Sequence, residues 1–199
     1  QAVGMGTSAT DGDLDIDVYS LSALTGGAQG VYLEAVSALR LGSMALTGEL
    51  QITVDTGDLV MTGQASAGKT LLRVQQGNLL MSDALAGTSP AARFTANGDA
   101  YVAVNGDITL TQFTVADGLL TMSADRGNFI DGTMAESSAQ PNIEVTGAGR
   151  IVKLSALAMG DATEDGEIEI SAAQIDRIQT LAGSGAAATA SVSGGQLSS

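Results

Sequence analysis

The sequence has neither cysteine nor histidine among its 199 residues. Without cysteine, the chain has no disulfide framework and no thiolate chemistry. Without histidine, it lacks the commonest general base and the commonest ligand of transition metals. Catalytic triads of the Ser-His-Asp kind and histidine-based zinc sites are therefore excluded.

Aromatic and basic residues are also scarce. Aromatic residues make up 3% of the chain and tryptophan is absent, which suits a thin repetitive core better than the core of a globular enzyme. Eight Lys and Arg stand against 22 Asp and Glu, so the formal net charge is −14. Such a surface repels nucleic acid and anionic lipid. No apolar run approaches the ~20 residues that cross a bilayer. We therefore expect no nucleic-acid partner and no membrane span.

Glycine is abundant, with 26 copies, and much of it belongs to one recurring unit. In Gly106-Asp107-Ile108-Thr109-Leu110, a glycine and a polar residue precede two aliphatic residues that are two positions apart. Glycine permits a tight turn, and side chains two apart lie on one face of a strand. Each unit therefore predicts a turn followed by a strand. Near-copies of the unit begin at Gly12, Gly48, Gly57, Gly77, Gly118 and Gly166.

These glycines recur at a nearly fixed spacing. One series advances in steps of 18 to 21 residues, and a second lies about half a period out of phase. A fixed period of about 20 residues is typical of a solenoid. We therefore predict an all-β fold, a β-solenoid (β-helix) with coils of about 20 residues around an aliphatic column. The first series is Gly12, Gly30, Gly48, Gly68, Gly87, Gly106, Gly127, Gly147, Gly166 and Gly185, and the second is Gly57, Gly77, Gly98 and Gly118.

The segments outside the glycine repeat, and the residues that fill the core, are also assigned from the sequence. The stretches around Pro90 and Pro141 resemble loops that lengthen the repeat locally, and residues 31–41 fit either a helix or the repeat. Residues 171–181 place Ile175, Ile178 and Leu181 on one face and predict a short C-terminal helix. Residues 1–182 then form one β-rich repeat domain, followed by a flexible Gly/Ala/Ser tail or assembly segment at 183–199. The residues assigned to the core are Met61, Met81 and Met122, and those assigned to the core or to stacking between coils are Tyr19, Tyr32, Tyr101, Phe94, Phe113 and Phe129.

The segment Gly63 to Thr70 matches the phosphate-binding pattern G-x-x-x-x-G-K-[ST]. In a nucleotide-binding protein, Lys69 would reach the β- and γ-phosphates and Thr70 would bind magnesium. However, the motif needs a strand, a loop and a helix. Here Thr70, Leu72 and Val74 alternate as in a strand, so nucleotide binding is the alternative and not the main prediction.

Two acidic stretches raise the possibility of calcium binding. Asp161, Thr163, Asp165, Gly166 and Ile168 follow the first positions of an EF-hand loop, but Ala172 occupies the position of its bidentate carboxylate. Asp11, Asp13, Asp15 and Asp17 alternate, but Ile16 occupies the position of the turn glycine. The favoured interpretation is a solvated strand face and a polar turn, with a calcium-stabilised adhesin module as the alternative.

Carboxylates for glycoside hydrolysis would have to come from turn residues, since stacked coils bring such turns together. Nothing in the sequence separates these residues from ordinary turn aspartates. We predict no catalytic residue, no cofactor and no metal ligand, and therefore no enzyme. The four candidate carboxylates are Asp107, Asp117, Asp125 and Asp131.

The glycine units of residues 48–170 resemble the repeats of filamentous haemagglutinin-type exoproteins. The resemblance rests on the copies at Gly48, Gly57, Gly77, Gly106, Gly118 and Gly166. It implies a right-handed β-helical fibre that bacteria secrete and use for adhesion and surface contact. A pilus-like subunit that exchanges a terminal strand is the other assembly that such a chain suggests.

The expected function is therefore structural. The first residue, Gln1, indicates a mature chain whose signal peptide was removed, or a fragment. We expect an extracellular, cell-surface protein without catalysis, a subunit or fragment of a β-rich surface fibre or filament. Its expected partners are further copies or a larger surface protein, and a ligand on a host or neighbouring cell.

Overall fold

The structure is a computed structural model that describes residues 6, 12–81, 92–133, 140–160, 166–180, 190–193 and 196–197. The regular elements of these residues are strands, without a helix, and their pairing is parallel throughout. Inside the strands, buried aliphatic residues alternate with outward ones, as in Leu50-Gln51-Ile52-Thr53-Val54. Side chains of a strand point alternately to its two faces, so this pattern buries one face of each sheet. The predicted all-β class is confirmed.

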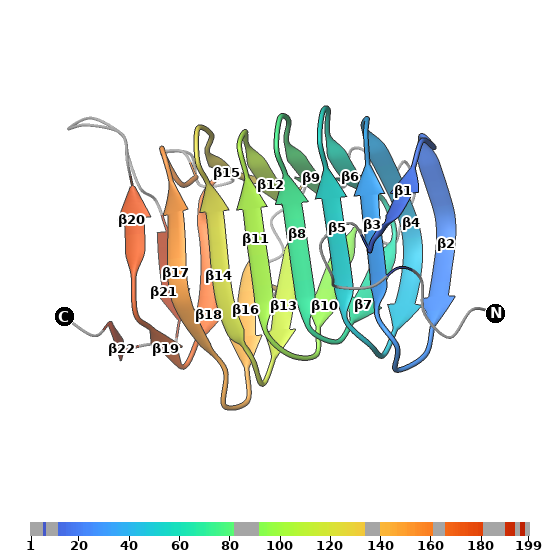
Figure 1. The fold of residues 1–199 in the computed structure, drawn as a ribbon. Helices are drawn as coiled ribbons and strands as arrows, with labels where there is room; N and C mark the ends of the chain where they lie inside the picture. The colour runs from blue at the N-terminus through green and yellow to red at the C-terminus, as the bar shows by residue number, and fades with distance from the viewer. Residues whose placement is uncertain are drawn as a thin grey trace.

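Two sheets face each other and run along the length of the molecule (Figure 1). In the described part of the chain, the first sheet contains ten strands. Its order starts with β1 near the N-terminus and ends with β22, while β20 pairs with β17 beside the main path. Its strands are β1 (Leu14–Ile16), β3 (Val31–Ala35), β5 (Leu50–Val54), β8 (Thr70–Val74), β11 (Ala100–Val104), β14 (Leu119–Ala124), β17 (Arg150–Ala156), β19 (Gln174–Ile175), β20 (Ile178–Thr180) and β22 (Gln196–Leu197).

The second sheet has two arms that share one long strand, β4. The first half of β4 pairs with β6, and its second half pairs with β7. Later crossings of this sheet are therefore split into two short strands with a corner between them. Its strands are β2 (Ser20–Gly26), β4 (Leu39–Leu46), β6 (Leu59–Met61), β7 (Gln64–Ala67), β9 (Leu79–Met81), β10 (Arg93–Ala96), β12 (Ile108–Leu110), β13 (Gln112–Ala116), β15 (Phe129–Asp131), β16 (Ile143–Thr146), β18 (Ile168–Ala172) and β21 (Ala190–Ser193).

The chain alternates between the sheets and returns each time one strand further along. Leu50 of β5 pairs with Thr70 of β8, 20 residues later. Thr70 in turn pairs with Ala100 of β11, a step of 30 residues. The additional residues fall between β9 and β10, around Pro90, and a second long step, from Leu119 to Arg150, contains Pro141. The prediction that the proline stretches lengthen the repeat is confirmed.

The two glycine series of the sequence do not each follow one position of the fold. Gly48 and Gly68 precede strands of the first sheet, whereas Gly106 precedes β12 of the second. Gly57 and Gly77 precede strands of the second sheet, and Gly98 precedes β11 of the first. The insertion before β10 is about half a repeat long. After it, a glycine of the first series precedes a strand of the second sheet and a glycine of the second series precedes a strand of the first, while the apparent spacing within each series is preserved. The assumption of one constant period is therefore wrong across residues 82–91.

Glycine is required where turns of successive repeats lie against each other. Gly57 has a φ of 88°, in the region that side chains disfavour. A Cβ added to Gly127 would lie 2.2 Å from the carbonyl carbon and oxygen of Gly106. The glycine of the repeated unit therefore permits two backbones to approach closely, in addition to forming the turn.

A continuous apolar core fills the space between the sheets, from Val31 to Ile175. Phe94 and Phe113 are neighbours in register and stack at 5.0 Å between ring centroids, with 15° between their planes. The predicted burial of these rings, of Phe129 and of Met61, Met81 and Met122 is confirmed. Two tyrosines are not in the core: Tyr19 is 70% exposed and Tyr101 is 42% exposed.

The predicted helix at 171–181 is wrong, because the structure places strands there. Residues 168–172 form β18, and the following residues form β19 and β20 in the other sheet. Ile175 pairs with Ile151, and Ile178 pairs with Leu154. A break at residues 176–177 restarts the alternation of the strand, so that Ile175 and Ile178 both face the core at a spacing that imitates a helix.

The ambiguous segment 31–41 is strand, since it contains β3 and the start of β4. At the other end, residues 190–193 pair with β18 and residues 196–197 pair with β19. These six residues of the predicted tail therefore extend the two sheets. Leu181 lies outside the described residues, and so do the other residues of the tail.

Candidate functional sites

The Gly63 to Thr70 segment forms a strand, a turn and a strand. It contains β7, and Thr70 is the first residue of β8. The Thr70 side chain is buried, and its hydroxyl donates a hydrogen bond to the Gly68 carbonyl oxygen at 3.2 Å. Lys69 is exposed, with its Nζ 3.7 Å from Glu49 Oε1. The backbone therefore lacks the helix N-terminus on which a P-loop relies to bind phosphate.

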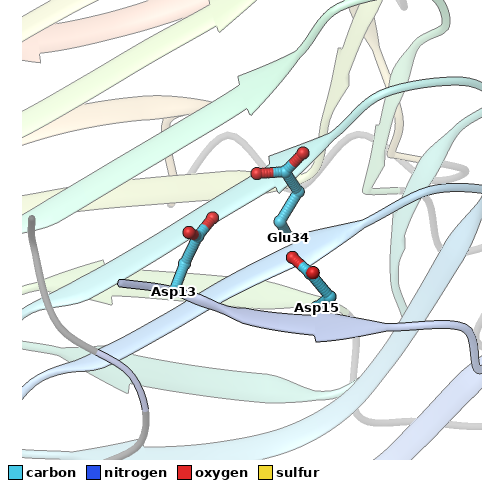
Figure 2. A group of neighbouring side chains, drawn as sticks. All are labelled: Asp13, Asp15 and Glu34. Atoms are coloured by element: carbon cyan, nitrogen blue, oxygen red, sulfur yellow. The ribbon is translucent and has the colours of Figure 1, made fainter. Parts of the chain in front are cut away.

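An acidic cluster lies at the N-terminal edge of the first sheet. Asp13 and Asp15 come from the β1 segment and Glu34 comes from β3, and Asp15 and Glu34 are paired in register. One carboxylate oxygen from each residue lies within 4.8 Å of the others (Figure 2). The sequence indicated Asp13 and Asp15 but not Glu34, because strand pairing brings Glu34 to them. Calcium takes six to eight oxygen ligands, so three carboxylates supply part of such a shell.

Crowding of these carboxylates changes the titration of Glu34. A hydrogen bond with the Asp13 carboxyl, desolvation, and repulsion by Asp55, Asp13 and Asp15 together raise the pKa of Glu34 to about 7. The protonated form can donate a hydrogen bond to Asp13, whereas the ionised form places three negative charges on two neighbouring strands. Pairing between β1 and β3 is therefore weaker when Glu34 is ionised.

We expect stability to fall as the pH rises from about 4.5 to about 7. Between these values the folded protein holds a proton on Glu34 that the unfolded chain releases, so each increase in pH favours unfolding. Glu34→Gln should remove this slope and should be more stable than the wild type above pH 7. Urea unfolding at several pH values measures both effects. Glu144→Gln, on the outer face of β16, is the control, and an unchanged slope in Glu34→Gln would contradict the assignment.

The other acidic candidates do not form a cluster of carboxylates within the described residues. Asp161 to Asp165 of the EF-hand-like stretch and Asp11 lie outside the described residues, and Ala172 is in strand β18. Among the four carboxylates considered for glycoside hydrolysis, Asp107 hydrogen-bonds to Asn128 and Asp131 to Thr133 and Asn142. Asp117, with a φ of 59°, accepts a hydrogen bond from the Ala148 N–H. These bonds give Asp107, Asp117 and Asp131 structural roles.

A ladder of alternating aspartate and asparagine runs along the turns before the second sheet. We call Asp58, Asn78, Asp107 and Asn128 the Asx ladder. Asn78 donates its backbone N–H and Nδ2 to Asp58 Oδ1, each at 2.9 Å, and accepts the Asp107 N–H on Oδ1 at 2.8 Å. Asn128 donates to Asp107 Oδ1 in the same way, at 2.8 and 3.3 Å. The polar residue after the repeat glycine therefore binds successive repeats to one another.

The alternation of charged and neutral members should matter for stability. Asn78→Asp would place three carboxylates in successive repeats and would remove the Nδ2 donor to Asp58. We expect a loss of roughly 1–3 kcal/mol in the free energy of unfolding, reduced by high salt. Asp107→Asn keeps an acceptor oxygen and should cost under about 1 kcal/mol. Urea denaturation at low and high salt tests the pair, and equal costs for the two variants would contradict the role of charge.

A buried polar network lies at the corner between the arms of the second sheet. Asn142 Nδ2 donates to the carbonyl oxygens of Leu110 and Thr111, at 3.2 and 3.3 Å, and to Asp131 Oδ1 at 2.9 Å. Its Oδ1 accepts the Glu169 N–H at 2.9 Å. One fully buried amide thus connects three successive repeats. No sequence motif indicates this role, because its partners are up to 32 positions away.

A groove lies on the outer face of the second sheet at its N-terminal end. Its volume is about 540 Å³. It crosses four neighbouring strands, β2, β4, β7 and β10. Its lining combines small apolar, hydroxyl and amide side chains with one arginine. These residues are Ala23, Thr25, Ser43, Met44, Ala45, Gln64, Ala65, Ser66, Arg93 and Thr95.

Comparison of the chain with protein-family models, with curated proteins and with solved structures gave no match. A search of the described residues also found no helix with the length and apolarity needed to cross a membrane.

Proposed function

We propose that the chain is a β-solenoid with a structural or adhesive role at the cell surface, as a subunit or fragment of a β-rich fibre. The observation that supports this proposal is the in-register parallel pairing of successive repeats around one apolar core. Each repeat buries its apolar face against its neighbours, so a stack of repeats behaves as a stiff rod. The Asx ladder and the Asn142 network add polar bonds along the same axis.

The N-terminal end of this stack suits self-association. Within the described residues, β1 pairs only with β3 and β2 pairs only with β4, so both strands are edges. Edge strands present backbone groups that can pair with another chain. Large apolar side chains are exposed beside them: Leu14 and Val18 are each 42% exposed, and Tyr19 is 70% exposed. A further copy would bury these side chains and continue both sheets.

Electron microscopy and analytical ultracentrifugation over a range of concentrations test the assembly. The wild type should form filaments or larger species as its concentration rises. Leu14→Lys should suppress them, because it places a charge at the edge of β1. Leu119→Lys is the matched control, since Leu119 is also 42% exposed but lies on β14 in the middle of the first sheet. A wild type that stays monomeric at high concentration would contradict self-association.

Nucleotide binding is the competing proposal, and a titration separates it from the structural role. Lys69 pairs with Glu49 on the turn before β8, so Lys69→Ala should leave any weak nucleotide binding unchanged. Tight magnesium-dependent binding of ATP that is lost in Lys69→Ala would instead support the phosphate-binding interpretation.

A further inference from the structure

The groove on the second sheet offers polar side chains and one positive charge to a ligand. It spans four adjacent parallel strands, β2, β4, β7 and β10. Neighbouring strands are about 4.8 Å apart, so the groove extends roughly 14 Å along the stack. That length accommodates several units of a chain-like ligand lying across the strands.

Two rows of outward side chains form the floor of the groove. Ala45, Ser66 and Thr95 are aligned in register in one row, and Gln64 and Arg93 are aligned in the other. The side chains of Ala45 and Ser66 are small, so they leave room above this part of the sheet for a ligand. Hydroxyl and amide groups at this floor donate and accept hydrogen bonds.

Arg93 supplies the one positive charge in the lining. Among the described residues, no carboxylate lies within 4 Å of its guanidinium group. A guanidinium group offers five donors in a planar fork that matches a carboxylate. The Arg93 guanidinium group therefore has donors available to a ligand in the groove.

The lining favours one class of occupant. The main-chain groups of β4, β7 and β10 are engaged in the sheet, so an acidic peptide could add as a strand only at the edge of β2. A polyhydroxylated ligand, in contrast, matches the hydroxyls of Ser43, Ser66 and Thr95 and the amide of Gln64.

We propose that this groove binds a short carboxylate-bearing oligosaccharide, with Arg93 on a sugar carboxylate and the hydroxyl and amide side chains on sugar hydroxyls. The net charge of −14 opposes dense polyanions. At physiological salt, charges more than about 8 Å away are largely screened, so the positive charge of Arg93 dominates the electrostatic potential at its own position. The site adds a ligand to the surface role, and it does not depend on self-association.

Calorimetric titration with a galacturonic acid trimer tests the proposal, with maltotriose as the neutral probe and triglutamate as the acidic peptide. The wild type should bind the acidic sugar about tenfold more tightly than either other probe, because only that sugar satisfies both Arg93 and the hydroxyl row. Arg93→Gln should weaken binding of the acidic sugar about tenfold and leave binding of maltotriose unchanged.

Two further variants test whether binding requires the groove itself or only a positive charge anywhere on the surface. Arg73→Gln makes the same charge change on exposed residue 73 of the first sheet and should leave binding unchanged. Ser66→Tyr fills the groove with a residue that strands tolerate, and it should abolish binding while circular dichroism shows a folded protein. Filament formation should be the same in Arg93→Gln as in the wild type, which separates this site from the assembly proposal. Absence of binding in the wild type, equal binding of triglutamate, or equal losses in Arg93→Gln and Arg73→Gln would overturn the proposal.

Discussion

Phe113→Ala should lower the free energy of unfolding by about 3–5 kcal/mol, as is usual when a buried phenylalanine is truncated. The ring of Phe113 is fully buried and stacks on that of Phe94. Phe94 lies on β10 and Phe113 lies on β13, and these two strands pair with each other. β10 also pairs with β7 and β13 also pairs with β16, so both strands are held in register on both sides. Because these strands cannot easily move closer to fill the space left by the ring, a cavity remains, and the loss of free energy of unfolding should fall at the upper end of the range. Urea unfolding followed by circular dichroism measures it.

Two comparisons identify the source of this loss. Phe113→Leu retains much of the buried apolar volume and loses the ring contact, so it should cost clearly less than Phe113→Ala. Tyr101→Ala removes another aromatic side chain, but one that is 42% exposed, and it should cost under about 1 kcal/mol. Similar losses for Phe113→Ala and Tyr101→Ala would contradict the placement of the stacked pair in the core.

The strands and the core could be predicted from the sequence because both depend on local alternation. A glycine, a polar residue and two aliphatic residues two apart specify a turn and a strand with one buried face, wherever the unit occurs. The prediction succeeded for β5, β6, β9, β12 and β18, each of which begins at the first aliphatic residue of such a unit. It did not exclude Tyr19 and Tyr101 from the core, since an aromatic side chain packs on either face of a strand and only the register decides which face is buried.

Features that depend on pairing between distant residues could not be predicted in the same way. The contact of Glu34 with Asp13 and Asp15 requires the register of β1 against β3, and the Asx ladder requires steps of 20, 29 and 21 residues between its members. The step of 29 residues spans the insertion before β10, where counting glycines at a constant period leads from one sheet to the other. The helix prediction at 171–181 failed for a related reason, because a break between β19 and β20 reproduces helical spacing.

The Asn142 network is the strongest example of such a long-range feature, and its removal should have the second large effect. Asn142→Ala removes the donor to Leu110, Thr111 and Asp131 and the acceptor of the Glu169 N–H. Unpaired buried polar groups cost about 1–3 kcal/mol each, so we expect a total loss of roughly 2–4 kcal/mol in the free energy of unfolding.

Asn142→Leu separates hydrogen bonding from packing, because leucine branches at the same carbon as asparagine, fills the site and has no polar group. If the hydrogen bonds dominate, Asn142→Leu should be no more stable than Asn142→Ala. Asn97→Ala is the control, since exposed residue 97 donates a single bond to the Ala67 carbonyl oxygen at 3.1 Å, and its loss should cost under about 1 kcal/mol. Chemical denaturation of the three variants measures the differences. A leucine variant as stable as the wild type would show that the corner needs only volume, and that the three repeats are joined there by the apolar core alone.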